Sequence, residues 1–152
     1  MKKIIITAII YILLSPIAHA QAITKKDARH LLEQALTYLK TSDTTSFINL
    51  WRLDDAPYPY HQRPYTRADV IGDFNQLKVF LDTALKQNLT IDNIEIEQAM
   101  QKDTAKNFGE YKIKAWFRYD EHYYKGFGFY VEYKNNKWVI RFSPDTSVMR
   151  KN

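Results

Sequence analysis

The chain of 152 residues contains no cysteine and only four glycines. The missing cysteine excludes disulfides, a thiol nucleophile, a thiolate metal site and lipid attachment at a cysteine. The four glycines do not have the spacing of a glycine-rich phosphate-binding loop. The formal charge is only +5, and no run of lysine or arginine exceeds two residues, so binding to nucleic acid or to a membrane surface has little support.

Hydrophobic runs are also short. The longest, Ile4–Leu14, is too short to cross a membrane. It follows the charged pair Lys2 and Lys3, and a small-residue cleavage site ends at Ala20. This pattern predicts a secretory signal peptide over residues 1–20. The alternative is an uncleaved anchor helix, which the length of the run disfavours.

Cleavage near Ala20 would leave residues 21–152, a length typical of one domain. Loss of Lys2 and Lys3 would lower the formal charge from +5 to +3. We expect a periplasmic protein, or a secreted one, with no stable membrane insertion after cleavage. The sequence leaves the oligomeric state open.

Three stretches carry apolar residues at helical spacing: 24–40, 44–52 and 66–88. Thr24 and Thr66 begin the first and third, each with an aspartate three residues later, which is a weak form of the capping box. The segment Ala56–Tyr65 contains three prolines, which exclude a helix or a central strand. We expect it to form an extended rim or a short edge hairpin.

Strands are predicted over Leu89–Gln98 and, as three consecutive antiparallel strands, over Glu110–Phe142. Asn135 and Asn136 suit a two-residue hairpin turn because asparagine tolerates positive φ. With that turn, the predicted pairs that share one apolar face are Tyr133 with Trp138, Val131 with Ile140, and Phe129 with Phe142. The polar segment Ser143–Asn152 is expected to fray.

In the preceding hairpin, a two-residue turn does not bring the apolar residues of the two strands to the same face. A two-residue turn at Asp120-Glu121 would place the apolar set of residues 111–119 on the face opposite Phe127 and Phe129. The sequence therefore predicts either an odd-length loop around residues 120–122 or a β-bulge near Gly126 or Gly128, and a curved sheet.

Grouped helices followed by grouped strands predict an α+β domain. The order resembles the nuclear-transport-factor-2-like superfamily, the cystatin-like cone that includes ketosteroid isomerase and polyketide cyclases. The resemblance is carried by the helical pair 24–52, the Pro/Tyr segment 56–65, the helix 66–88 and the closing Lys134–Phe142. It implies N-terminal helices packed on a curved antiparallel sheet of four or more strands.

That resemblance also implies a pocket between helices and sheet. The candidates to line it are Trp51, Tyr58, Tyr60, Phe74, Tyr124 and Tyr130. The alternative is that these aromatic residues only fill the core. Because enzymes of the superfamily place Asp, His or Tyr inside the cone, the resemblance makes Asp73 with His61 or Tyr65 a candidate pair for proton transfer. The alternative is that Asp73 is a solvated helix residue.

The histidines of the mature chain, His30, His61 and His122, lie far apart in the sequence. No cluster has the spacing of metal ligands, so we expect neither a metal nor a cofactor.

A binding role has its own candidates on the polar face of one strand: Lys112, Lys114, Trp116 and Arg118. Aromatic and cationic residues often anchor protein interfaces. The alternative is that lysine stems simply cover Trp116. Our first hypothesis is an exported, non-catalytic domain that binds another envelope or secreted protein, as an immunity-type toxin neutraliser or in a secretion assembly. The second is a small-molecule-binding or proton-transferring cone-fold enzyme.

Overall fold

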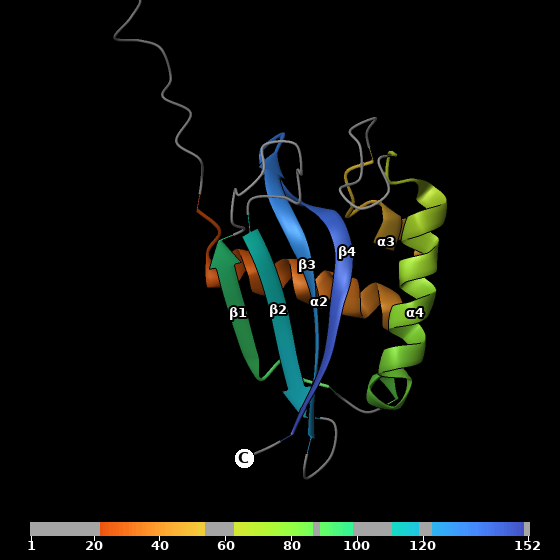
Figure 1. Ribbon diagram of the computed structural model, residues 1–152, viewed down its shortest axis with the longest axis vertical. Helices are drawn as coiled ribbons and strands as arrows, with labels where there is room; N and C mark the ends of the chain where they lie inside the picture. Colours follow the sequence, from red (N-terminus) through yellow and green to blue (C-terminus); the bar gives the residue numbers. More distant parts are fainter. Residues whose placement is uncertain (1–21, 54–62, 87–88, 99–110, 119–122, 151–152) are drawn as a thin grey trace, which may run out of the picture.

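A computed structural model describes residues 22–53, 63–86, 89–98, 111–118 and 123–150 (Figure 1). The elements are α2 (Lys25–Thr41), α3 (Thr44–Ile48), α4 (Arg67–Leu85), β1 (Asn93–Gln98), β2 (Tyr111–Arg118), β3 (Tyr123–Lys134) and β4 (Lys137–Arg150). Helices packed on a curved antiparallel sheet confirm the predicted α+β class. The predicted signal peptide and most of the Pro/Tyr segment lie outside the described residues.

Both long helices begin with a complete capping box. The Thr24 hydroxyl accepts from the backbone N–H of Asp27 at 3.1 Å, and the Asp27 carboxylate accepts from the backbone N–H of Thr24 at 3.1 Å. Thr66 and Asp69 repeat this arrangement at the start of α4. Two otherwise unpaired N–H groups are thereby satisfied at each helix start, as the sequence predicts.

The second helix is shorter than the predicted range 44–52. α3 ends at Ile48, and Trp51 forms a parallel bridge with Ile140 on the edge of β4. The backbone N–H of Arg52 donates to the Ile140 carbonyl at 2.9 Å, and the N–H of Ile140 donates to the Leu50 carbonyl at 2.8 Å. Strand pairing therefore replaces the last predicted helical turn.

The four strands form one meander in the order β1-β2-β3-β4. In the β2–β3 pair Ile113 lies opposite Phe129 and Ala115 opposite Phe127, so the apolar sets share a face. In this pairing an odd number of residues separates the last two partners, Arg118 and Tyr124, along the chain. This corresponds to the odd-length connection, one of the two predicted alternatives. The connecting residues 119–122 lie outside the described part of the chain.

In the β3–β4 pair the turn and its first pairs are as predicted. Asn135 and Asn136 have φ of 51° and 60°. Tyr133 lies opposite Trp138 and Val131 opposite Ile140.

Beyond Val131 the register of this pair shifts. Tyr130, not Phe129, lies opposite Phe142, so the predicted Phe129–Phe142 pair is wrong. A second shift places Gly128 opposite Asp145, which leaves Pro144 unpaired in the ladder. Because proline has no N–H to donate, a bulge is where a strand tolerates it. The predicted frayed tail instead continues as β4 to Arg150.

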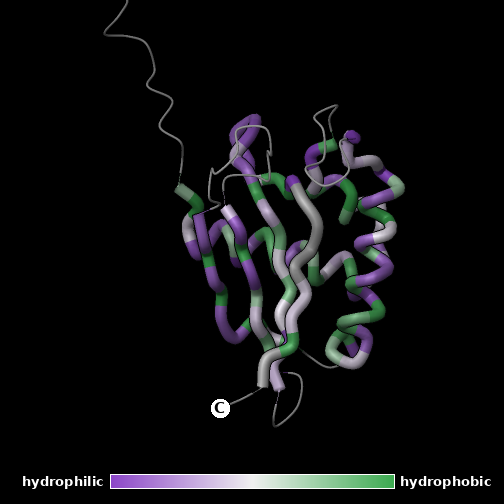
Figure 2. Tube along the Cα trace, in the orientation of Figure 1, coloured by the Kyte–Doolittle hydropathy of each residue, from purple (hydrophilic) through white to green (hydrophobic). Residues whose placement is uncertain are grey.

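The sheet has two unlike faces. On the covered face, five side chains are fully buried: Ile113, Ala115, Phe127, Phe129 and Val131. They join one hydrophobic core with the inner sides of α2 and α4. Figure 1 shows α2 behind the sheet and α4 beside β4. Figure 2 shows hydrophobic and hydrophilic stretches alternating along the strands. We call the opposite side, which carries Lys112 and Lys114, the outer face.

Candidate functional site

A buried carboxylate lies in the second turn of α4. Asp73 is 9% exposed, and the Tyr65 hydroxyl donates a hydrogen bond to its Oδ2. Burial raises the pKa of Asp73 to about 6, although the Tyr65 hydrogen bond acts in the opposite direction. The structure thus brings together the predicted pair Asp73 and Tyr65, and Asp73 is not a solvated helix residue.

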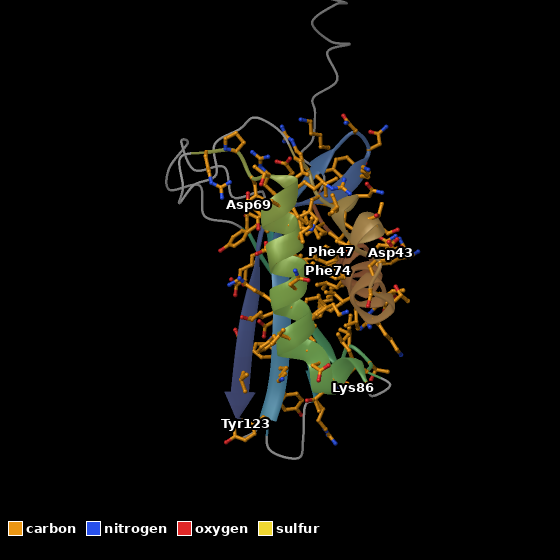
Figure 3. The ribbon with its side chains drawn as sticks, turned by 90° about the vertical axis from the view of Figure 1, so that its right-hand side faces the viewer. Asp43, Phe47, Asp69, Phe74, Lys86 and Tyr123 are labelled. Atoms are coloured by element: carbon orange, nitrogen blue, oxygen red, sulfur yellow. The ribbon has the colours of Figure 1, made fainter. Side chains whose placement is uncertain are left out.

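Aromatic rings fill the space around this pair. The Trp51 ring stacks on Tyr65 with centroids 5.2 Å apart and planes 14° apart. The Phe47 ring contacts the Phe74 ring edge-on, with centroids 5.1 Å apart, and its centroid lies 6.4 Å from that of Phe129. Figure 3 shows Phe47 and Phe74 next to each other between the helices. These contacts make a packed aromatic cluster.

A second carboxylate lies nearby at the rim. Arg63 donates two hydrogen bonds of 2.7 Å to the two carboxylate oxygens of Asp69. Its guanidinium lowers the pKa of Asp69 well below the ordinary range, so Asp69 stays charged. The negative charge of Asp69 adds to the rise in the pKa of Asp73.

The predicted pocket residues divide between the two faces of the sheet. Trp51 and Phe74 belong to the covered core beside Asp73 and Tyr65. Tyr124 and Tyr130 pair with Arg118 and Lys112, so they lie on the outer face. The structure therefore does not bring these two tyrosines next to Trp51. Tyr58, Tyr60 and His61 lie outside the described residues.

On the outer face, the predicted row Lys112, Lys114, Trp116 and Arg118 follows β2. Opposite it on β1, Glu97 pairs with Lys112 and Glu95 with Lys114. The charges of this row are therefore partly compensated across the strands. Arg118, at the end of the row, is exposed.

Trp116 is the centre of that row and is only 8% exposed. The Lys114 Nζ lies 4.8 Å from the centroid of its ring, and the same ammonium donates to the Ser147 hydroxyl at 2.8 Å. The ring also lies against Gly126, where an added Cβ would be 2.7 Å from it. Trp116 therefore supports Lys114 and presents little of its own ring to a partner.

Two hollows beside the β3–β4 hairpin were not predicted from the sequence. One, of about 440 Å³, lies between α2 and the hairpin and includes His30, Gln34 and Trp138. The other, of about 320 Å³, includes Arg52, Lys134 and Lys137. The sequence signal for the second hollow is the pair of lysines that flank the Asn135-Asn136 turn.

Within the described ranges, no group of three or more His, Asp or Glu side chains is placed to hold a metal ion. Among the described helices, none is long and apolar enough to cross a membrane.

A scan against protein-family models and a search of curated proteins found no match. Among solved structures, the chain is similar to the beta subunit of the benzoate 1,2-dioxygenase from Burkholderia mallei. The two are 14% identical with a TM-score of 0.44, and the match covers 86% of this chain and 93% of that chain. The α+β class stated above rests on this chain's own elements and their pairing.

Proposed function

We propose that this chain is an exported, non-catalytic binding domain of the bacterial envelope whose partner is another envelope or secreted protein. The proposal is supported by the difference between the two sides of the sheet. Aromatic rings fill the interior beside Asp73, whereas cations and half-exposed tyrosines gather on the outer face. A filled interior leaves the surface as the place for recognition.

The outer face suits a protein partner with carboxylates at its contact surface. Arg118 is exposed, and Tyr124 and Tyr130 lie beside the lysine row. Arginine and tyrosine are enriched at the centres of protein interfaces. The role we propose for this face is either to neutralise a toxin or to join a secretion assembly.

The test is a pull-down from envelope extract with the wild-type chain, Trp116→Ala and Arg118→Ala. Trp116→Ala removes the support of Lys114, and Arg118→Ala removes an exposed cation, so both should reduce recovery of the partner. Val79→Ala is the matched control, because Val79 is 80% exposed on α4, away from the outer face. Equal recovery with all variants would count against this face.

One observation favours the second candidate function, proton transfer: the pKa of Asp73 is raised to about 6 and Asp73 contacts a tyrosine hydroxyl. A buried acid that titrates near neutral pH is typical of general acid–base chemistry. Phenol is a suitable probe, because its ring can pack on the aromatic rings of the cluster and its hydroxyl can hydrogen-bond to Asp73. Saturable NMR shifts at Tyr65 and Phe74 would support a substrate site there, and their absence would count against it.

A further inference from the structure

The hollow of about 320 Å³ lies where the segment that follows α3 meets the β3–β4 hairpin. Trp51, Arg52 and Leu53 line one side, and the hairpin lines the other with Lys134, Asn135, Lys137 and Val139. Its volume is within the range of about 300–1,000 Å³ common for small-molecule sites. Three of its seven lining residues are cations and none is an anion.

The position of Arg52 in this hollow is fixed by a buried partner. Its guanidinium donates to the carboxylate of Glu132, which is 7% exposed and lies on β3. The backbone of Arg52 is also held, by its hydrogen bond to Ile140. The Glu132 carboxylate thus pairs with Arg52, and the two lysines leave the hollow with an excess of positive charge.

The other two cations lie directly opposite each other. Lys134 pairs with Lys137 in the ladder, on either side of the Asn135-Asn136 turn. Like charges at directly opposite positions destabilise a hairpin. In the part of the chain that the structure describes, neither ammonium group has an ion-pair partner.

Several lysines elsewhere do have polar partners. Lys86 pairs with Asp82 at 2.8 Å, Lys125 donates to the Phe80 carbonyl at 2.6 Å, and Lys78 donates to the Ser42 hydroxyl at 2.7 Å. The lysine pair at the hairpin is therefore an uncompensated repulsion at the mouth of a hollow. An anion between the two ammonium groups would convert that repulsion into attraction.

We propose that this hollow is an anion-binding site that takes a carboxylate or phosphate group between Lys134 and Lys137. Arg52 adds positive charge from the opposite wall, and the Asn135 side chain supplies an amide donor. An ammonium group acts as a point charge and does not select between the two anions. The site lies at the hairpin, apart from the row on β2, and does not depend on the proposed partner.

The test is an NMR titration of the full chain at low ionic strength with two probes, inorganic phosphate and a hexaglutamate peptide. Saturable shifts should centre on the amides of residues 134–139. Lys134→Gln with Lys137→Gln should weaken binding at least about tenfold, since both close charge contacts with the anion are lost. Lys25→Gln with Lys40→Gln, an equal charge change at exposed positions on α2, is the control and should bind like the wild type.

The two probes separate the sources of the anion. Saturation by both identifies a small-anion site, and saturation by hexaglutamate alone identifies side-chain carboxylates of an acidic segment. Saturation by neither, or shifts spread equally over Lys25 and Lys40, would overturn the proposal.

A melting experiment checks the same proposal without NMR. In low-salt buffer the double hairpin variant should melt above the wild type, because the repulsion is gone. Added phosphate should raise the melting temperature of the wild type and leave that of the variant nearly unchanged. An equal rise for both proteins would contradict a site at the hairpin.

Discussion

The two faces of the sheet are made by the same strands and differ in almost every property. On the covered face, alternate residues of β2 and β3 are apolar, fully buried and packed on helices. On the outer face, the intervening residues include lysines, tyrosines, Trp116, Arg118 and two glycines. Burial of the first set stabilises the fold, and the second set is left to interact with partners.

The carboxylates on the two sides of the sheet differ in their partners. The covered side has one strongly perturbed acid, Asp73, which accepts a hydrogen bond from the neutral Tyr65 hydroxyl. On the outer side Glu132 has a guanidinium partner, and Glu95 and Glu97 face lysines across the strands. A buried carboxylate without a cation is costly to ionise, whereas a paired one is not. The interior therefore responds to pH, and the outer face should respond to salt.

The largest expected effect is at the centre of the aromatic cluster. Phe47 is fully buried and contacts the rings of Trp51, Phe74 and Phe129. Phe47→Ala should lower the free energy of unfolding by about 3–5 kcal/mol, through lost burial and a cavity. Urea denaturation measures the change. Val79→Ala, at an 80% exposed position, should change it by less than about 0.5 kcal/mol. Similar losses in both variants would break the contrast between the two environments.

The next effect is a change in the pH dependence of stability. The pKa of Asp73 is about 6 in the folded chain, raised from its ordinary value of 3.8. Between these values the folded state holds more protons than the unfolded state. The contribution of this group is therefore full below about pH 4 and is lost as pH rises through 6.

Asp73→Asn removes this titration and keeps an acceptor for the Tyr65 hydroxyl. Between pH 4 and 7 its stability should change less than that of the wild type. At pH 8 the variant should be more stable by up to about 3 kcal/mol, the equivalent of the pKa difference. Thermal melts across this pH range measure both quantities, with Asp92→Asn at an exposed position as the control. A wild type and variant with parallel pH profiles would show that Asp73 titrates normally.

A smaller effect is expected at Gly128 of β3, which lies against the backbone of β2. A Cβ on Gly128 would lie 2.2 Å from the Ile113 carbonyl oxygen and 2.9 Å from the Lys114 Cα. Gly128→Ala should cost about 1–3 kcal/mol, because backbone atoms must move apart. Gly72→Ala meets nothing within 4 Å on α4 and should stabilise the chain by up to about 1 kcal/mol. Opposite signs in urea denaturation are expected, and equal signs would contradict the close approach.

The smallest effect concerns the helix starts. Thr66→Ala removes the hydroxyl that accepts from the Asp69 N–H and should cost about 1 kcal/mol. Thr83→Ala, at an exposed position near the other end of α4, should be neutral or slightly stabilising. Differential scanning calorimetry can resolve the two. No loss for Thr66→Ala would mean that the capping box adds little to the fold.

The sequence predicted the fold well where local chemistry decides it. Thr24 and Thr66 mark the helix starts, and the alternation of apolar residues predicted an odd-length loop or a bulge in the β2–β3 hairpin, whose register the structure gives as Ile113 opposite Phe129. The shift between Tyr130 and Phe142 was missed, because alternation does not reveal which strand holds an extra residue.

The candidate site was only partly predictable for a similar reason. Tyr65 and Asp73 are eight residues apart and meet at the start of a single helix, so the pair could be proposed from the sequence. Arg52 and Glu132 are eighty residues apart and meet only because Trp51 bridges to Ile140. The predicted inward orientation of Tyr124 and Tyr130 depended on a register that the sequence left open.

Site-specific photo-crosslinking in the living cell tests the central claim, a binding surface on the outer face, most directly. A photoreactive residue would replace Lys112 or Arg118 on that face, or Val79 on α4 as the control. We expect one discrete protein adduct from positions 112 and 118 and none from position 79. Adducts of equal yield from all three positions, or none from positions 112 and 118, would contradict it.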